Sequence, residues 1–175
     1  MGLEVLQYPD PRLKLKSAPV AEITPEIKKL AEDMAATMYE ADGIGLAAPQ
    51  VGRLLRMIVT DISGPAQQEA LRVYINPELT PLPPLPGEEE TQVSEEGCLS
   101  VPDYRSMVRR CSRVRLQALD LEGNPVLLEA AGLEAICLQH ECDHLEGRLF
   151  LDHVSRLKRY LYDDKIKKGL IPIPD

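Results

Sequence analysis

The sequence is poor in aromatic residues, with no Trp, one Phe and six Tyr among 175 residues. A hydrophobic core must therefore be built mainly from aliphatic side chains and methionine. The chain also lacks an apolar run of membrane-spanning length. Residues 1–16 have neither the apolar centre of a secretory signal nor the Arg- and Ser-rich character of a transit peptide. These absences predict a cytoplasmic protein that does not enter a membrane.

Positive charge is also in short supply, because 20 Lys and Arg stand against 28 Asp and Glu, giving a net charge of −8. Nonspecific attraction to nucleic acid is therefore disfavoured, and we expect no direct sequence-specific binding of nucleic acid. The four cysteines contain no Cys-x-x-Cys pair, and a reducing cytoplasm argues against disulfides. At least one of these thiols has to be considered as a metal ligand.

Histidine is the scarcest ionisable residue, and two of the three histidines lie in one His-Glu-x-x-His stretch, at His140 and His144. Residues four apart lie on one face of a helix, about one turn apart, so both imidazoles can bind the same metal ion. Glu141 lies beside the first histidine and can act as general base toward a metal-bound water. The alternative is an amphipathic helix whose core-facing stripe, beginning at Leu133, happens to contain two histidines with other partners. The match of helical context and mechanism favours the metal site.

A catalytic metal usually has three protein ligands and one open position, so a third ligand must come from elsewhere in the chain. Cys98 could supply it as a thiolate, although a buried structural cysteine would look the same in the sequence. The segment 43–50 contains two glycines that allow close backbone approach, and Gln50 offers an amide donor. It is not a phosphate-binding loop, because the Gly-Lys-Ser/Thr ending is missing.

Local signals predict helices near both ends of the chain, with short strands and the histidine helix between them. Thr24 and Pro25 have the N-cap and first-turn chemistry of a helix that ends at Asp42-Gly43. Five prolines in residues 77–87 exclude a central strand and predict a stiff surface loop. Strands are predicted over 56–61, 71–75, 113–119 and 126–128, and further helices over 132–146 and 156–168. We therefore expect one α+β domain over residues 1–175, with antiparallel strands packed around a central metal-binding helix and with an N-terminal and a C-terminal helix.

Three motifs, in this order along the chain, resemble those of peptide deformylase: Gly-Ile-Gly-Leu-Ala-Ala-Pro-Gln at 43–50, Glu-Gly-Cys-Leu-Ser at 96–100 and Gln-His-Glu-Cys-Asp-His at 139–144. The arm at 5–11 is also similar, and the resemblance runs from about residue 5 to residue 155. It implies a single catalytic domain that hydrolyses the N-formyl group from the N-terminal formyl-methionine of newly made polypeptides and releases formate. It also implies one metal ion, Fe(II) in the native state, held by Cys98, His140 and His144. Zinc or nickel would be able to replace the iron, and the ligand chemistry alone suits zinc without excluding iron.

The chemistry of formyl hydrolysis gives each of these residues an expected role. The metal would lower the pKa of its water so that a hydroxide attacks the formyl carbon, while Glu141 takes the proton and later gives it to the departing amine. Charge on the formyl oxygen would be stabilised by the Gln50 side chain, the backbone N–H of Leu99 and the metal. The segment around Gly45 would pair with the substrate backbone as an added strand. The methionine pocket is expected to be formed by Ile44, Leu133, Ile136 and Cys137. Glu96 and Arg105 are expected at its rim, as at the family's matching positions, with plain core packing as the alternative for all six.

Some residues near the motifs support the site or depart from the family pattern. Asp143 is expected to orient the site through Arg110, although a surface acid would fit its usual exposure equally well. Cys111 and Cys142 are interpreted as structural. Ser94 stands where an apolar pocket residue would be usual in the family, and the Pro-rich segment is also unexpected.

Family members can dock on the ribosome through a basic C-terminal helix. In this chain the lysines and arginines of residues 156–168 are offset by Asp163 and Asp164, and Ser155-Arg156 replaces the Ser-Pro that is common in the family. The charge pattern favours a solvent-exposed helix face, and ribosome contact is what the resemblance alone implies.

Two alternatives to deformylation stay open. A zinc metallopeptidase could use the same histidine helix on a different substrate, and a non-catalytic metal-binding protein could use the same ligands without turnover. Gln50 and Cys98 in their motifs favour the deformylase over the peptidase. Glu141 argues against a purely structural site, which has no use for a base.

Overall fold

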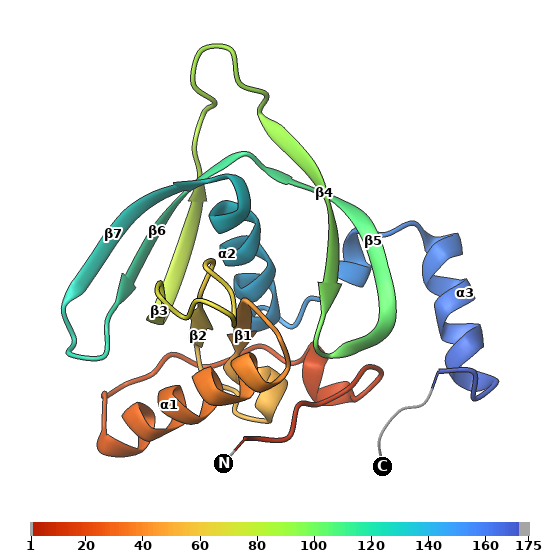
Figure 1. Ribbon diagram of the computed structural model, residues 1–175, viewed down its shortest axis with the longest axis horizontal. Helices are drawn as coiled ribbons and strands as arrows, with labels where there is room; N and C mark the ends of the chain where they lie inside the picture. Colours follow the sequence, from red (N-terminus) through yellow and green to blue (C-terminus); the bar gives the residue numbers. More distant parts are fainter. Residues whose placement is uncertain (1, 172–175) are drawn as a thin grey trace.

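Two antiparallel sheets surround a central helix in the computed structural model, which describes residues 2–171 (Figure 1). The larger sheet has the strand order β1-β2-β3-β6-β7, and the smaller pairs β4 with β5. The central helix α2 (Gly132–Leu145) contacts strands of both sheets. The strands are β1 (Gly45–Ala47), β2 (Met57–Thr60), β3 (Arg72–Pro81), β4 (Thr91–Cys98), β5 (Val101–Cys111), β6 (Arg113–Leu119) and β7 (Pro125–Ala131). The expected α+β class and central helix are confirmed, and no helix in residues 2–171 is long and apolar enough to cross a bilayer.

The N-terminal helix α1 (Pro25–Glu40) begins as the sequence predicts. The Thr24 hydroxyl accepts a hydrogen bond from the Ile27 N–H at 3.3 Å, and α1 packs its apolar face on β1 and β2. The predicted end is wrong in one detail. Asp42, at φ 56°, and not Gly43, takes the left-handed position after the helix, and the Gly43 N–H bonds to the carbonyl of Met38. A short acidic side chain tolerates this conformation better than most.

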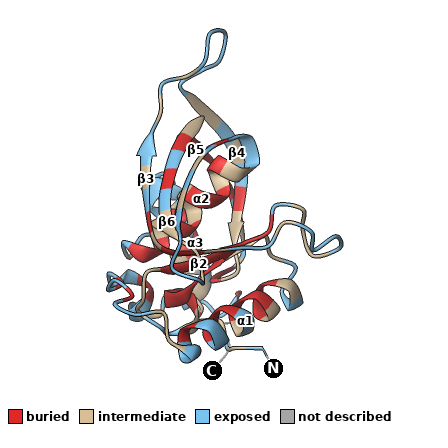
Figure 2. Ribbon diagram, turned by 90° about the vertical axis from the view of Figure 1, so that its left-hand side faces the viewer, coloured by how far each residue is buried: buried red, intermediate tan, exposed pale blue. Residues whose placement is uncertain are grey.

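The Pro-rich segment is a loop only in its second half, which corrects the prediction for residues 77–87. Strand β3 continues to Pro81 and pairs with β6, with an irregularity between Ile75 and Glu78. Strand β2 flanks β3 only as far as Ile75, so Pro77 and Pro81 lie where β3 has one neighbouring strand and a missing N–H costs no ladder bond. Residues 82–90 form the expected exposed loop, which projects from the body (Figure 2).

The hairpin of β4 and β5 was not predicted. Its strands pair from Thr91 opposite Cys111 to Cys98 opposite Val101, and the chain reverses through Leu99 and Ser100. The hairpin of β6 and β7 was predicted correctly in place, although β7 is longer than expected. Together the two hairpins flank α2, and the first carries Cys98 to the helix face that holds the histidines.

The last helix, α3 (Arg156–Lys167), lies outside β5 (Figure 1) and begins at the predicted cap, where Ser155 Oγ accepts from the Lys158 N–H. It is anchored by Tyr162, which is 2% exposed and donates its hydroxyl to the Pro102 carbonyl at 2.7 Å. Residues 2–171 also contain three short 3₁₀ helices, at Pro11–Lys14, Ala48–Val51 and Phe150–His153.

Candidate metal centre and active site

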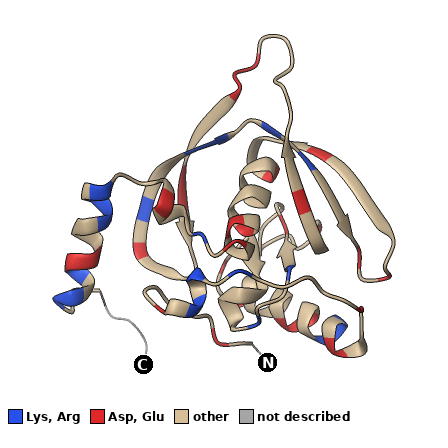
Figure 3. Cartoon of the chain, turned by 180° about the vertical axis from the view of Figure 1, so that it is seen from behind, with Lys and Arg blue, Asp and Glu red and all other residues tan. Residues whose placement is uncertain are grey.

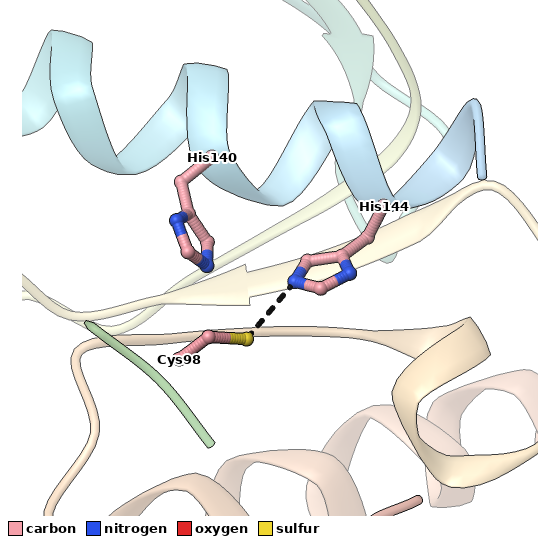
Figure 4. Close-up of side chains that lie close together, drawn as sticks. All are labelled: Cys98, His140 and His144. Carbon is pink, nitrogen blue, oxygen red and sulfur yellow. Dashed lines mark hydrogen bonds between the residues drawn. The ribbon is translucent and has the colours of Figure 1, made fainter. Parts of the chain in front are cut away.

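The three predicted ligands come together between the central helix and the end of β4. His140 and His144 project from the same face of α2 toward Cys98 (Figure 4). Their ligand atoms all lie within 4.8 Å of one another, and Cys98 Sγ is 3.4 Å from His144 Nε2. Ligands at about 2.3 Å (sulfur) and 2.1 Å (nitrogen) from one tetrahedral metal would be about 3.6 Å apart. The spacing and the donor set therefore fit a mononuclear metal.

A buried carboxylate fixes the orientation of the first histidine. His140 Nδ1 lies 2.9 Å from Glu96 Oε1. Burial alone would raise the pKa of Glu96, but hydrogen bonds from Arg110 and His140 outweigh it and lower the pKa to about 2. The carboxylate is therefore ionised and accepts the Nδ1–H, which leaves the lone pair of Nε2 free to face a metal.

Glu96 lies deeper than the predicted pocket rim. It is 5% exposed, and Arg110 donates to both of its oxygens, each at 2.9 Å. The remaining Arg110 nitrogen, Nη1, donates to Asp143 Oδ2 at 2.6 Å, so the expected contact between Arg110 and Asp143 is confirmed. Burial opposes ionisation of Asp143, yet hydrogen bonds from His153 and Arg110 lower its pKa.

Glu141 is placed where a proton acceptor can act. Its side chain is buried, and Oε2 has no hydrogen-bond partner within residues 2–171. Burial raises the pKa of Glu141 to about 7, with His140 opposing and Glu96 adding to the shift. The carboxyl lies against Gly45, where a Cβ would be 2.5 Å from Oε1. A carboxyl that titrates near neutral pH can both take and return a proton.

The Gln50 side chain is held beside the ligand group. Its Oε1 accepts from the Ala47 N–H at 2.9 Å, which directs Nε2 toward Ser100 Oγ at 3.1 Å and Cys98 Sγ at 3.5 Å. Leu99 is held through its carbonyl, which accepts from Gln7 Nε2 at 2.9 Å. Ser100 was not predicted to take part, and only its place in the Glu-Gly-Cys-Leu-Ser motif could have drawn attention to it.

A cavity of ≈ 820 Å³ opens beside these groups. Leu133 lines its mouth and is 52% exposed, so the prediction that the core-facing stripe begins there is wrong. Cys137 is buried and donates to the Ile44 carbonyl at 3.6 Å, while Arg105 pairs with Glu95 at 2.6 Å on the exposed rim. The cavity brings together these predicted residues: Ile44, Gly45, Gln50, Glu96, Cys98, Leu99, Arg105, Leu133, Ile136, Cys137, His140 and Glu141.

The other two cysteines lie away from this cavity. Cys111 and Cys142 pack against the apolar cluster between α2 and the larger sheet. Burial raises the pKa of the Cys142 thiol to about 12, so it stays protonated. Their interpretation as structural remains a prediction.

Comparison with known proteins agrees with this site. A sequence profile named Polypeptide deformylase matches residues 3–160. The chain belongs to the polypeptide deformylase family. It is 50% identical to a peptide deformylase of Psychrobacter arcticus over 168 residues, which cover 96% of this chain and 88% of the relative. It is 51% identical to one of Acinetobacter baumannii over 166 residues, covering 95% of this chain and 90% of the relative.

Solved deformylase structures share the fold. A crystal structure from Legionella pneumophila covers 96% of this chain and 95% of its own, with a TM-score of 0.86 at 40% identity. One from Ehrlichia chaffeensis gives the same TM-score at 37% identity, covering 97% of each chain. The deformylase family is one of enzymes, and the Cys/His/His group lies within the matched residues, which supports a catalytic metal.

Proposed function

We propose that this chain, as a single catalytic domain, removes the formyl group from the N-terminal formyl-methionine of newly made polypeptides and releases formate. The observation that carries the proposal is the convergence of Cys98, His140 and His144 beside Glu141 at an open cavity. Membership of the deformylase family supports the substrate class.

The three converging residues would hold one metal ion, for which we propose Fe(II), with zinc or nickel able to replace it. A thiolate with two imidazoles suits zinc well and accommodates iron, so the preference for iron rests on the family. When bound, such a metal supplies Lewis acidity that makes water acidic near neutral pH. Glu96 and Arg110 hold the His140 ring in the orientation that this requires.

Glu141 acts as general base and acid in this proposal. Its buried carboxyl takes the proton of the attacking water, and it returns a proton to the departing amine. The Gln50 amide and the Leu99 backbone N–H stabilise the charge that develops on the formyl oxygen. Loss of one such donor typically costs about 3–4 kcal/mol of the barrier. Gly45 leaves room for the carboxyl and lies on the strand with which the substrate backbone would pair.

The methionine side chain would occupy the apolar part of the cavity. Ile44, Ile136 and Cys137 would line this part, with Leu133 at its mouth and Arg105 on its rim. For Glu96 we propose a different task from the rim position first expected, because Arg110 and His140 engage both of its oxygens.

We also propose that the enzyme works in the cytoplasm, where a Cys98 thiolate stays reduced. Transient contact between α3 and the ribosome is a further proposal from the family resemblance. Along α3, one acidic stretch lies between basic residues toward both ends of the helix (Figure 3). Asp163 accepts a hydrogen bond from the Tyr8 hydroxyl, and Asp164 forms an ion pair with Lys168. Both acidic side chains of the helix therefore have partners within the protein.

The test is purification without oxygen, followed by measurement of bound metal and of formate release from a formyl-methionyl peptide. We expect about one metal per chain and fast formate release. Cleavage of unformylated peptides without formate release would instead indicate the metallopeptidase. Bound metal with neither activity would indicate a non-catalytic metal protein.

A further inference from the structure

The third histidine of the chain, His153, lies outside the ligand group but is connected to it. It ends the short helix Phe150–His153, and its side chain is 35% exposed. Its Nε2 is 2.9 Å from Asp143 Oδ2 and 3.3 Å from Arg110 Nη1. We propose that His153 is a positioning residue for the metal ligand His140, acting through Asp143, Arg110 and Glu96.

The donors and acceptors in the contacts among His153, Asp143 and Arg110 follow from the chemistry of the side chains. The Arg110 guanidinium can only donate, and the ionised Asp143 carboxylate can only accept. If His153 Nε2 carried a lone pair, it would face the carboxylate oxygen as a second acceptor at 2.9 Å. His153 therefore donates its Nε2–H to Asp143 Oδ2, which receives a second hydrogen bond from Arg110 Nη1.

Arg110, at the middle of this series of contacts, has all of its side-chain nitrogens hydrogen-bonded. The Arg110 side chain is 3% exposed, and each of its three nitrogens donates to a carboxylate. Asp143 holds Nη1, while Glu96 holds Nε and Nη2. A displacement of Asp143 must therefore pull on the same guanidinium that holds Glu96. Hydrogen bonds linked in series in a poorly solvated site also polarise one another.

The inner end reaches the metal ligand directly. Glu96 Oε1 receives both Arg110 Nη2 and His140 Nδ1, each at 2.9 Å. A shift of Arg110 thus changes the bond that orients the imidazole and fixes its tautomer. Partners in direct contact with a ligand typically change metal affinity by about 10- to 100-fold when removed. His153 acts from three contacts further out, so we expect a smaller effect of the same sign.

The series of contacts from His153 through Asp143, Arg110 and Glu96 to His140, here called the relay, borders a cavity at its outer end. Behind α2, an outer cavity of ≈ 670 Å³ is lined by Arg110, Asp143, Arg148 and His153 among others. Without the His153 donor, Asp143 keeps one hydrogen bond and has room to turn into this cavity. Arg110 would then lose the anchor that aligns it with Glu96.

The inference rests on the proposed metal site, and its test uses the zinc-loaded full chain. Zinc release into excess chelator is measured at one fixed pH for the wild type and for three variants. We expect His153→Leu, which removes the donor, to release zinc about three- to tenfold faster than the wild type. His153→Gln retains an N–H donor and should stay near the wild-type rate. Arg148→Gln is the matched control, since Arg148 lines the same cavity and makes no side-chain hydrogen bond within residues 2–171.

A second readout separates positioning from plain stabilisation. Only three histidines contribute imidazole ¹⁵N signals, so the Nδ1 signal of zinc-bound His140 can be followed directly. It should move in His153→Leu and stay in place in His153→Gln. A merely structural role would lower the melting temperature of the metal-free protein but leave the zinc release rate and this signal unchanged, and that result would overturn the inference.

Coupling through Asp143 is tested in an Asp143→Asn background. There, His153→Leu should have no further effect on zinc release, and additive effects would overturn the relay. If Asp143→Asn does not fold, the His140 signal in the single variants decides. A wild type that binds zinc and a Leu variant that releases it at the same rate would refute only this inference. A wild type without bound metal would refute the proposed function as well.

Discussion

The carboxyl of Glu141 occupies space that exists only because residue 45 has no side chain. A Cβ at Gly45 would lie 2.5 Å from Glu141 Oε1 and 2.9 Å from its Cδ. Gly45→Ala must therefore displace the base, and misplacement of a reacting group by about 1 Å can cost about 100-fold in rate. We predict a fall in kcat of that size with metal content unchanged, measured as formate release and bound metal.

Gly64→Ala is the control for this substitution. Gly64 has φ 85°, and a Cβ there would meet nothing within 4 Å. Alanine at this left-handed position should lower stability by about 1 kcal/mol without changing kcat. A normal kcat in Gly45→Ala would mean that the position of Glu141 does not govern the reaction.

The chemical role of Glu141 can be separated from its shape. Glu141→Gln keeps the size of the side chain but cannot accept the proton, so we predict a fall in kcat of about 10²- to 10⁴-fold. Metal content should be retained, because Cys98, His140 and His144 are untouched. Thermal stability should not fall, because a neutral amide avoids the cost of burying a charged carboxylate. Turnover near the wild-type rate would rule out Glu141 as the base.

Single residues also show how far sequence reasoning reaches into the site. The spacing of His140 and His144 predicts a shared ligand face from local geometry, and the structure brings both to Cys98. The partners that orient them cannot be predicted in this way. Glu96 contacts His140 across 44 positions of sequence, and nothing local distinguishes its carboxyl from a pocket-rim acid. No local pattern predicts a role for His153 either, because tertiary structure brings its partner Asp143 near.

At the scale of elements, local capping chemistry was a sound guide, whereas hydrophobic alternation predicted β6 correctly but missed β5. The Thr24 cap places α1 correctly, as Ser155 does α3. Strand β5 was missed because its inward face carries polar residues, Ser106 and Arg110, alongside Val101 and Val108. Arg110 can be buried there only because Glu96 and Asp143 neutralise it, and such long-range pairing leaves no periodic pattern.

The junction of α1 with the larger sheet predicts a pH dependence. The Tyr39 hydroxyl on α1 donates to Asp61 Oδ2 at 2.6 Å, just after β2. Burial opposes ionisation of Asp61, but hydrogen bonds from Ser63 and Tyr39 lower its pKa below the ordinary 3.8. Because the folded pKa is the lower one, Asp61 stabilises the fold above the unfolded pKa, and this contribution is lost as the pH falls through the folded pKa.

Asp61→Asn should therefore have a lower melting temperature than the wild type at neutral pH. Its melting temperature should also fall less steeply with pH from about pH 5 downward, so that the two curves converge in acid. Glu89→Gln, on the exposed loop, is the control and should follow the wild type. Parallel curves for Asp61→Asn and the wild type would show that folding does not lower the pKa of this carboxyl.

At the scale of the whole molecule, the ligand group adds a link between the smaller sheet and α2, which the Glu96–His140 and Arg110–Asp143 contacts also join. Cys98 ends β4 in the smaller sheet, while both histidines lie on α2, which packs mainly against the larger sheet (Figure 1). One bound metal would therefore strengthen the connection of the β4–β5 hairpin to the helix. Metal binding that links elements in this way adds directly to folding stability.

Metal removal should accordingly lower the melting temperature as well as abolish formate release. At a free metal concentration about 1,000 times Kd, binding contributes about 4 kcal/mol. For a chain of this size each kcal/mol corresponds to about 2–4 °C, so a loss of about 8–16 °C is expected and should reverse when metal is returned. His144→Ala is the control, because its melting temperature should not respond to added metal.

The strands that lose stability on metal removal show whether the metal links the β4–β5 hairpin to α2 or stabilises the whole fold evenly. On metal removal, amide hydrogen exchange should accelerate more in β4 and β5, which are held by Cys98, than in β6 and β7, which pair within the larger sheet. Equal acceleration in both hairpins would mean that the metal stabilises the whole fold without joining its parts. An unchanged melting temperature would mean that the folded chain does not bind the metal appreciably more tightly than the unfolded chain does, and would contradict the prediction.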